Sequence, residues 1–152
     1  QNEMKVRLYK KDRGWGQESR WNDKFPNIKL DYADQSMKSM VKKCRVFIAT
    51  YNSTTYLETL AWNVPTIAFW NPSTWDLIEE VKDDFNLLKK VKILHDTPES
   101  AAQHLSEIWE DVPQWWQSTE VQQAREVFCR RWSYVGEDSF DRLYKTLKES
   151  SV

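Results

Sequence analysis

The chain has 152 residues and a formal net charge of −1, from 22 Lys and Arg against 23 Asp and Glu. Hydrophobic residues make up 40% and charged residues 30%, with only 3 Gly and 5 Pro, which excludes collagen-like, low-complexity and disordered chains. The balanced charge gives no global basic field, so we expect no nonspecific binding of nucleic acid. The length fits one α/β domain spanning residues 1–152.

Nothing in the sequence indicates a membrane or export segment. The longest apolar stretch covers residues 64–70, far short of the ~20 residues of a transmembrane helix, and no charged start precedes an apolar run. Cys44 and Cys129 are too few for a disulfide framework or a complete zinc site. We therefore expect a cytoplasmic protein with reduced thiols. Because the chain begins at Gln1 rather than Met, we also expect it to be a fragment of a longer protein.

The first half of the chain has the pattern of alternating strands and helices. Apolar runs and polar–apolar alternation predict strands at residues 5–9, 28–30, 46–49, 66–70 and 91–94. The run at 46–49 is continuously apolar, which is typical of a strand covered on both faces. Residues 10–24 are polar and predict a loop.

Helices are predicted between these strands and through the rest of the chain. Asp34 is the expected N-cap of the first, a second carries Leu57 and Leu60, and a third begins at about Thr74. After Thr97, which precedes a Pro and a Glu, the chain is helical. A strand–helix–strand order builds a parallel sheet with right-handed crossovers. The predicted fold class is therefore α/β, a parallel sheet flanked by helices with a C-terminal helical cluster.

The segment between the strand at 46–49 and the next helix is the candidate binding site. Ligands of open parallel sheets bind at the carboxyl ends of the strands, and a helix start offers unpaired N–H groups and a partial positive charge that suit a phosphate. Four hydroxyl or amide side chains crowd this point: Asn52, Ser53, Thr54 and Thr55. Ser and Thr are also ordinary helix caps, so the pattern alone leaves a purely structural role open.

Glu58 lies four residues after Thr54, on the same face of the expected helix. Helical side chains lean toward the N-terminus, so its carboxylate reaches back toward the same site. A carboxylate repels phosphate but accepts hydrogen bonds from sugar hydroxyls, and a nucleotide presents phosphate and ribose together. The sequence has no Gly-rich phosphate fingerprint, which argues against a dinucleotide-binding fold and a P-loop.

Residues 51–61 and 63–67, which read YNSTTYLETLA and NVPTI, carry a resemblance to a known family. Small polar residues, a Leu-Glu pair and a Pro before the next strand resemble the C-terminal, donor-binding half of GT-B glycosyltransferases. More narrowly, nearly the whole chain is similar to a transferase family associated with bacterial surface-polysaccharide loci, through residues 7–9, 14–15, 50–58, 69–72 and 115–116. The resemblance implies a Rossmann-like sheet that forms half of a GT-B fold. One departure is Asn63, where the wider pattern has Gly.

The resemblance also implies a donor and its binding residues. Ser53, Thr54 and the backbone amides that follow hold phosphate, and Glu58 holds the ribose. The donor is a nucleotide-diphosphate or nucleotide-monophosphate sugar. Arg7, on the first strand, resembles a basic residue aimed at the diphosphate; its position is equally that of a residue on a solvated strand face.

Other residues are weaker candidates. Arg13, with Gly14 beside it, and Trp15 are minor candidates for donor binding, because aromatic faces stack bases and sugars. His95 ends a predicted strand at the same sheet edge and is a weak candidate for a catalytic acid or base. His104 has no partner in the sequence pattern. No Asp-x-Asp motif is present, so no metal and no cofactor are expected.

The expected function is that of the donor-nucleotide-binding domain of a glycosyltransferase-like transferase, which moves a glycosyl or related phospho-linked group in surface-polysaccharide synthesis. By the resemblance, an N-terminal acceptor domain is missing and the fragment alone is inactive. Two alternatives stay open: a nucleotide-sugar epimerase domain, which needs acid and base residues, and a non-catalytic interaction module whose nine tryptophans bind a partner. Affinity for a nucleotide separates both enzyme hypotheses from the interaction module.

Overall fold

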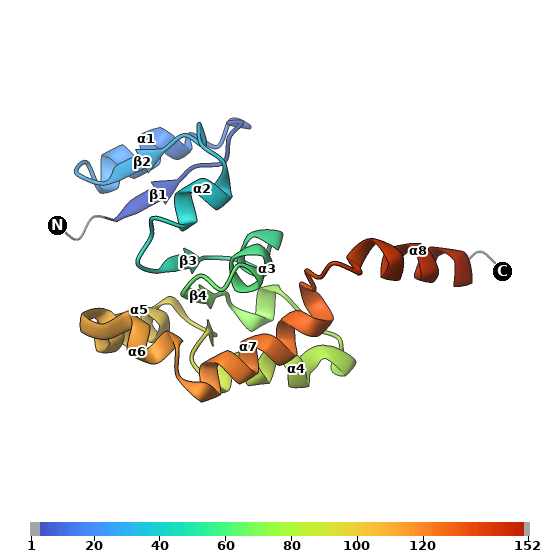
Figure 1. The fold of residues 1–152 in the computed structure, drawn as a ribbon. Coiled ribbons are helices and arrows are strands. Elements are labelled where there is room, and N and C mark those ends of the chain that lie inside the picture. The colour runs from blue at the N-terminus through green and yellow to red at the C-terminus, as the bar shows by residue number, and fades with distance from the viewer. Residues whose placement is uncertain (1–3, 151–152) are drawn as a thin grey trace. The chain divides into compact units, whose positions relative to one another are not determined.

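The computed structural model describes residues 4–150 of the chain, so Gln1 lies outside the described residues (Figure 1). The chain divides into two units, residues 1–43 and residues 44–152. Each unit pairs short parallel strands and flanks them with helices. The protein is therefore α/β, as the sequence predicts.

The first unit consists of two strands and two helices: β1 (Lys5–Arg7), α1 (Gln17–Lys24), β2 (Lys29–Asp31) and α2 (Met37–Val41). β1 and β2 pair in parallel, with Val6 opposite Leu30. Leu8, directly after β1, and Val41, at the end of α2, are buried. Both strands lie close to where the sequence predicts them.

The prediction of a loop at residues 10–24 is wrong for the second half of this segment, which forms α1. Gly16 precedes this helix in the left-handed conformation, with φ 55°. Trp21 is the single large apolar residue of the helix, and its ring lies 5.6 Å from that of Phe25. Because one apolar residue makes no periodic stripe, hydrophobic patterning could not find this helix.

The helix expected after Asp34 begins two residues later than predicted. Ser36 is the N-cap of α2, since its hydroxyl oxygen accepts a hydrogen bond from the Ser39 N–H at 3.2 Å. The helix ends at Val41, so Cys44 lies outside it and is exposed. Both Asp and Ser are good N-caps, and the sequence alone did not distinguish them.

The second unit is built on a three-stranded parallel sheet in the order β3-β4-β5. Its strands are β3 (Phe47–Ala49), β4 (Thr66–Phe69) and β5 (Leu94–His95). The chain passes from β3 to β4 through α3 (Thr54–Ala61), and from β4 to β5 through η1 (Pro72–Thr74) and α4 (Glu79–Lys90). The predicted strand–helix–strand order is confirmed, with Ala68 of β4 opposite both Ala49 and Leu94.

The helix expected from about Thr74 begins later in the structure. Asn71 caps the short η1 turn, because its side-chain oxygen accepts a hydrogen bond from the Ser73 N–H at 2.9 Å. The α-helix α4 then starts at Glu79. Ile78 is the exposed N-cap residue of α4.

Helices make up the C-terminal part of the second unit: α5 (Pro98–Ile108), η2 (Trp109–Asp111), α6 (Val112–Trp116), α7 (Thr119–Trp132) and α8 (Ser139–Glu149). α7 packs against α3 and α4, and α5 packs against β4 and β5 (Figure 1). The largest side chains of the core are Trp70, Trp116, Tyr56, Phe85 and Phe128. No residue of α8 is buried.

Candidate functional site

The three parallel strands of the second unit bring three loop segments to one edge of the sheet. β3 leads into residues 50–53, β4 into residues 70–71 and β5 into residues 96–97. α3 follows β3 directly after the first of these segments (Figure 1). The candidate segment therefore lies at the carboxyl ends of the strands, where parallel α/β folds bind their ligands.

The N-terminus of α3 has no side-chain cap. Ser53 occupies the N-cap position in an extended conformation, with φ −139° and ψ 172°, but its side chain accepts no hydrogen bond from the helix. At the starts of α5 and α7, by contrast, Thr97 and Ser118 each accept a hydrogen bond from the N–H three residues later. The first turn of α3 therefore presents N–H groups that no cap side chain satisfies.

The neighbours of Ser53 differ in burial and in their contacts. The half-buried Asn52 accepts a hydrogen bond on its side-chain oxygen from the Tyr56 hydroxyl at 3.1 Å, which ties the loop to the first turn of α3. Burial raises the pKa of Tyr56, so its hydroxyl stays a protonated donor. Thr54 is exposed and Thr55 is half-buried. The structure places all four predicted polar residues at one helix start.

Glu58 lies one turn after Thr54 on α3 and is exposed. Within residues 4–150 it forms no hydrogen bond or ion pair with another side chain. Its carboxylate therefore neither caps a helix nor balances a neighbouring cation in the described part of the chain.

Arg7 belongs to the first unit, where its guanidinium is already engaged. Nη1 lies 3.2 Å from the Asp31 carboxylate and 3.3 Å from the Met40 sulfur, and Nη2 donates to the Gln35 carbonyl oxygen at 2.6 Å. The side chain is 22% exposed. An Arg has five N–H donors, so these contacts leave some of its donors for a further partner.

Arg13 and Trp15 also belong to the first unit, in the loop between β1 and α1. The Arg13 guanidinium lies 5.8 Å from the centre of the Tyr9 ring, and that ring lies 6.3 Å from the ring of Trp15. Trp15 is 58% exposed. These two minor candidates share one loop with an exposed tyrosine, a grouping that the sequence analysis did not anticipate.

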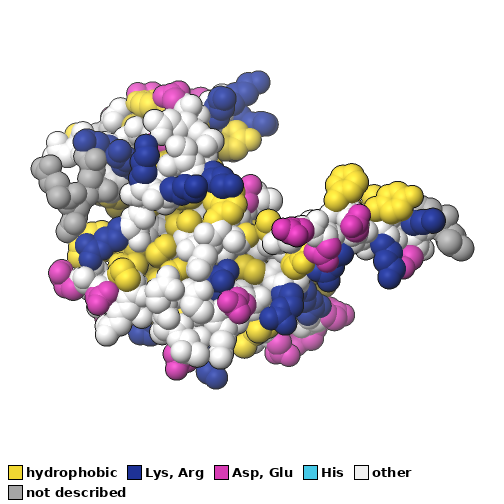
Figure 2. All heavy atoms as spheres, viewed as in Figure 1, with side chains coloured by type: hydrophobic (Ala, Val, Ile, Leu, Met, Phe, Trp, Pro, Cys, Tyr) yellow, Lys and Arg dark blue, Asp and Glu magenta, His cyan; other side chains and the backbone are white. Residues whose placement is uncertain are grey.

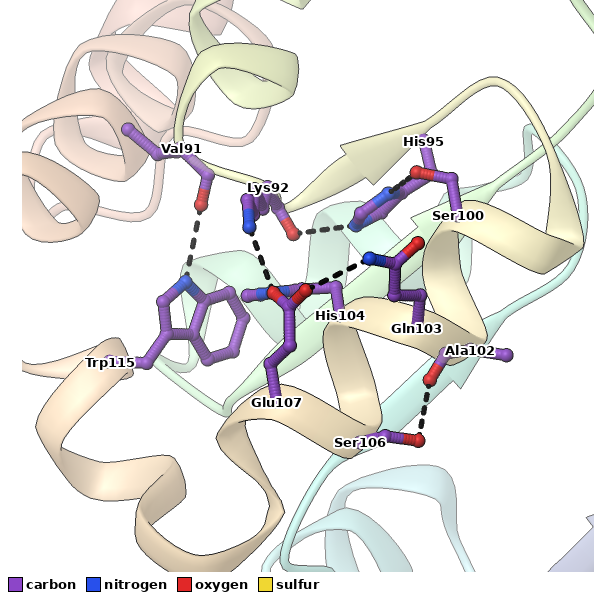
Figure 3. A network of polar contacts seen from close by, with 10 residues as sticks. All are labelled: Val91, Lys92, His95, Ser100, Ala102, Gln103, His104, Ser106, Glu107 and Trp115. Atoms are coloured by element: carbon purple, nitrogen blue, oxygen red, sulfur yellow. Dashed lines mark hydrogen bonds and ion pairs between the residues drawn. The ribbon is translucent and has the colours of Figure 1, made fainter.

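His95 is buried at the end of β5, and both of its ring nitrogens are engaged (Figure 3). Nε2 lies 3.0 Å from the Lys92 carbonyl oxygen, which can only accept, so this nitrogen carries the proton. Nδ1 then accepts a hydrogen bond from the Ser100 hydroxyl at 2.8 Å. Burial lowers the pKa of His95 below its ordinary value. Its catalytic role stays a prediction, because in this arrangement neither nitrogen faces a substrate unpaired.

His104 of α5 is buried beside His95, with 5.5 Å between the ring centres (Figure 3). Neither of its nitrogens has a hydrogen-bond partner within residues 4–150, and Nδ1 lies 3.7 Å from a Glu107 carboxylate oxygen, too far for a hydrogen bond. Its ring meets Trp115 edge-on at 4.9 Å. Burial lowers the pKa of His104 to about 4, and His95 and Lys92 act in the same direction. The imidazole is therefore neutral at pH 7.

The two histidines line a hollow of about 360 Å³ beside β5 and α5. Two ion pairs lie among its lining residues: Lys89 with Asp96 at 2.6 Å, and Lys92 with Glu107 at 2.9 Å. Two cations thus face two carboxylates, and the histidines are neutral, so the hollow carries no net charge to select a ligand. It is a feature of the second unit that sequence analysis missed. The only available signal was the spacing of Ala101, His104 and Ile108, which puts His104 on the inner face of α5.

Two further classes of site are not found in the described structure. Between residues 4 and 150, no group of three or more His, Cys, Asp or Glu is arranged to hold a metal ion. Within the same range, none of the helices combines the length and the apolar composition needed to cross a membrane.

The family of the chain follows from comparison with known proteins. No curated protein and no solved structure matches the sequence. A family model described as LIC12162 family transferase matches residues 1–147. The chain is thus a transferase at the level of class. It belongs to the LIC12162 family, whose description names neither a donor nor an acceptor.

Proposed function

We propose that the chain is the donor-nucleotide-binding part of a transferase that moves a glycosyl or related phospho-linked group in surface-polysaccharide synthesis. In this proposal the sheet of the second unit belongs to a Rossmann-like, C-terminal half of a GT-B fold. An N-terminal domain of a longer protein binds the acceptor and supplies the catalytic base. The membership in a transferase family supports the reaction class; the donor and the pathway are proposed from the site and the resemblance.

The observation that carries the proposal is the uncapped start of α3 at the carboxyl edge of the sheet. The Ser53 side chain caps none of the first N–H groups of α3, and the positive end of the helix dipole favours an anion at that point. The hydroxyls of Thr54 and Thr55 add further donors for phosphate oxygens. Asn52 contributes its side-chain amide N–H groups, since its oxygen is held by Tyr56.

Glu58 is assigned to the ribose of the donor. It is exposed and has no partner side chain in the described structure, and it lies one turn into the helix whose start binds the phosphate. A carboxylate accepts hydrogen bonds from two neighbouring hydroxyls with little geometric strain. In the first unit, Arg7 is proposed separately as a phosphate-binding residue, with Arg13 and Trp15 as weaker candidates for donor binding.

The residues proposed here bind and stabilise charge. Helix amides directed at the departing phosphate stabilise the negative charge that develops on it in the transition state. An Arg makes bidentate contacts with phosphate and never loses its charge. Both contributions come from this chain, and proton transfer at the acceptor comes from the proposed N-terminal domain.

The two alternatives find less support in the structure. An epimerase needs acid and base residues with accessible protons, and both nitrogens of His95 are engaged. A tryptophan-rich interaction module needs exposed indoles, and only Trp15 and Trp75 of the nine are exposed. Trp70 and Trp116 are core residues.

A thermal-shift screen of the chain with UDP, CDP, GDP, ADP and CMP tests the proposal. A nucleotide present at 100 times its Kd stabilises the chain by about 2.7 kcal/mol, which is a clear rise in melting temperature. We expect at least one nucleotide to produce this rise and thereby to identify the base of the donor. If none raises the melting temperature at millimolar concentration, the nucleotide-binding proposal for this chain fails and the interaction module takes its place.

A further inference from the structure

Two aromatic rings stand exposed in the loop between β1 and α1. Tyr9 is 53% exposed and Trp15 is 58% exposed. Their ring centres lie 6.3 Å apart with 45° between the ring planes, so each ring shields one side of the other and leaves an outer face to solvent. Contiguous exposed apolar surface is a common feature of sites that bind a ligand or a partner.

The loop holds these rings in fixed positions. The Tyr9 N–H donates to the Gln17 side-chain oxygen at 3.1 Å, and the Trp15 N–H donates to an Asp12 carboxylate oxygen at 2.9 Å. Gly14, directly before Trp15, has φ 81°, a conformation that favours glycine. Among residues 4–150, no atom outside Gly14 and its two chain neighbours lies within 4 Å of the point where a side chain of Gly14 would begin. Trp15 is therefore presented on a preorganised loop with open space beside it.

The surroundings of the rings are basic. Lys10, Lys11 and Arg13 share the loop with one acid, Asp12, and residues 1–43 contain eleven Lys and Arg against six Asp and Glu. Figure 2 shows dark-blue Lys and Arg side chains beside exposed hydrophobic ones at the tip of the first unit. The Arg13 guanidinium lies 5.8 Å from the Tyr9 ring centre. The ligand that complements this loop is a flat ring that presents hydrogen-bond acceptors at its edge.

We propose that the Tyr9–Trp15 loop is a stacking site for the base of a nucleotide. Every nucleobase has a π-face that stacks on an aromatic side chain, and guanidinium N–H groups donate to the oxygen and nitrogen atoms of its edge. Sugar hydroxyls both donate and accept hydrogen bonds, whereas the Lys and Arg side chains of this loop can only donate. Here Asp12 and Gln17 each use a side-chain oxygen on the loop backbone, and the remaining polar groups are cations.

This inference rests on the proposed function for the choice of a free nucleotide, but every residue in it belongs to the first unit. It is tested with ligands that have a base and no phosphate. Saturation-transfer NMR on the full chain with uridine, cytidine, guanosine and adenosine detects nucleoside binding that does not depend on a phosphate. We expect saturation transfer to at least one nucleoside.

Trp15→Ala should lower the affinity of the chain for that nucleoside about 5- to 150-fold, which is the range for loss of one base–aromatic stack. Trp15→Phe should retain most of the affinity. Trp75→Ala is the matched control, because Trp75 is the exposed tryptophan of the second unit. Circular dichroism and the melting temperature of each variant show whether it is folded, and we expect no change because Trp15 is exposed.

Binding of pyrophosphate, measured by thermal shift, separates this inference from the proposed function. Pyrophosphate has no ring, so its binding should be weakened in Thr54→Val, which removes one hydroxyl donor, and unchanged in Trp15→Ala. If no nucleoside receives saturation, or if Trp15→Ala binds the nucleoside as the wild type does, the stacking site is overturned even where pyrophosphate binds. If nucleosides bind through Trp15 and pyrophosphate does not bind, the stacking site stands and the phosphate site at α3 fails.

Discussion

The indole Nε1 of Trp116 donates a hydrogen bond to the side-chain oxygen of Asn63 at 2.9 Å, across 53 residues of sequence. Trp116 is 1% exposed, and Asn63 has the left-handed conformation with φ 55°. The same oxygen accepts from the Gln122 amide at 3.2 Å. The turn between α3 and β4 is thus tied to α6 and α7 by one side chain. A Gly in its place, as in the wider glycosyltransferase pattern, would supply the backbone conformation without these bonds.

Replacing Asn63 should therefore lower the free energy of unfolding even when the new residue readily adopts the left-handed backbone conformation. Asn63→Gly keeps the left-handed conformation and removes the acceptor from a buried indole, which costs about 1–2 kcal/mol of the free energy of unfolding. The Asn63 backbone carbonyl oxygen also accepts from the indole nitrogen at 3.2 Å. Because this acceptor remains in the variant, the loss stays within this range. Urea denaturation measures the change in the free energy of unfolding. Asn63→Asp, which keeps an acceptor at the same place, is the control and should lose less. Equal stability of Asn63→Gly and wild type would show that the backbone carbonyl alone suffices.

Glu58→Ala should weaken nucleotide binding and leave the fold intact. Hydrogen bonds to a charged group contribute about 1.5–3 kcal/mol, so we expect a 10- to 100-fold rise in Kd. Glu58 is exposed, so the melting temperature without ligand should not change. Isothermal titration with the nucleotide identified in the screen measures the affinity. Glu80→Ala, at an exposed position of α4, is the matched control. An unfolded Glu58→Ala variant would instead identify Glu58 as a structural residue.

The chain should lose stability on mild acidification, because of His104. Its pKa is about 4 in the folded state and 6.5 ordinarily, so the unfolded chain binds the proton more readily. Stability is complete above pH 6.5 and falls as the pH approaches 4, by up to about 3 kcal/mol for this group. The groups that face the imidazole are His95, Lys92, Glu107 and the ring of Trp115.

Urea denaturation at pH 7.0, 6.0 and 5.0 measures this loss. His104→Leu should flatten the dependence between these values, because the apolar side chain has no proton to bind. The lowered pKa of His95 acts in the same direction, so part of the slope remains in the variant. A slope that His104→Leu leaves unchanged would show that the loss arises elsewhere.

Removing α8 should barely change the stability of the chain. None of its residues is buried, and Phe140, Leu143 and Tyr144 are more than half exposed. A chain that ends at Val135 should melt within about 2 °C of the full chain. Phe128→Ala on α7 is the contrasting variant: its side chain is 0% exposed, so truncation should cost about 3–5 kcal/mol. A large drop on removing α8 would mean that its apolar face is covered in solution.

The alternation of strands and helices along the chain and the start of α3 could be predicted because the sequence patterns that indicate them are local. Residues 46–49 and 66–70 are short apolar runs, and the polar segment between them precedes a helical pattern. The structure confirms the two strands and the helix that joins them. α1 was missed because helical patterning depends on an apolar stripe and Trp21 alone does not make one.

The contacts of the candidate residues could not be predicted, since they depend on chain folding over long distances. Arg7 meets Gln35 and Asp31 from 28 and 24 residues away, and no local pattern encodes those pairs. The meeting of His95 with His104 depends on how α5 packs along β5. In the sequence the two histidines lie nine residues apart with no pattern that joins them, and only the fold brings their rings to 5.5 Å from each other.

The ion pairs beside β5 have a consequence for how this chain behaves at high concentration. β5 is an edge strand of its sheet and is only two residues long. Lys89, Lys92, Asp96 and Glu107 surround it with charge. An edge of this kind offers no continuous row of backbone groups to a strand from another molecule, and charged side chains oppose its approach. These exposed ion pairs contribute little to the stability of the fold, but they oppose pairing of another molecule with the β5 edge of the sheet.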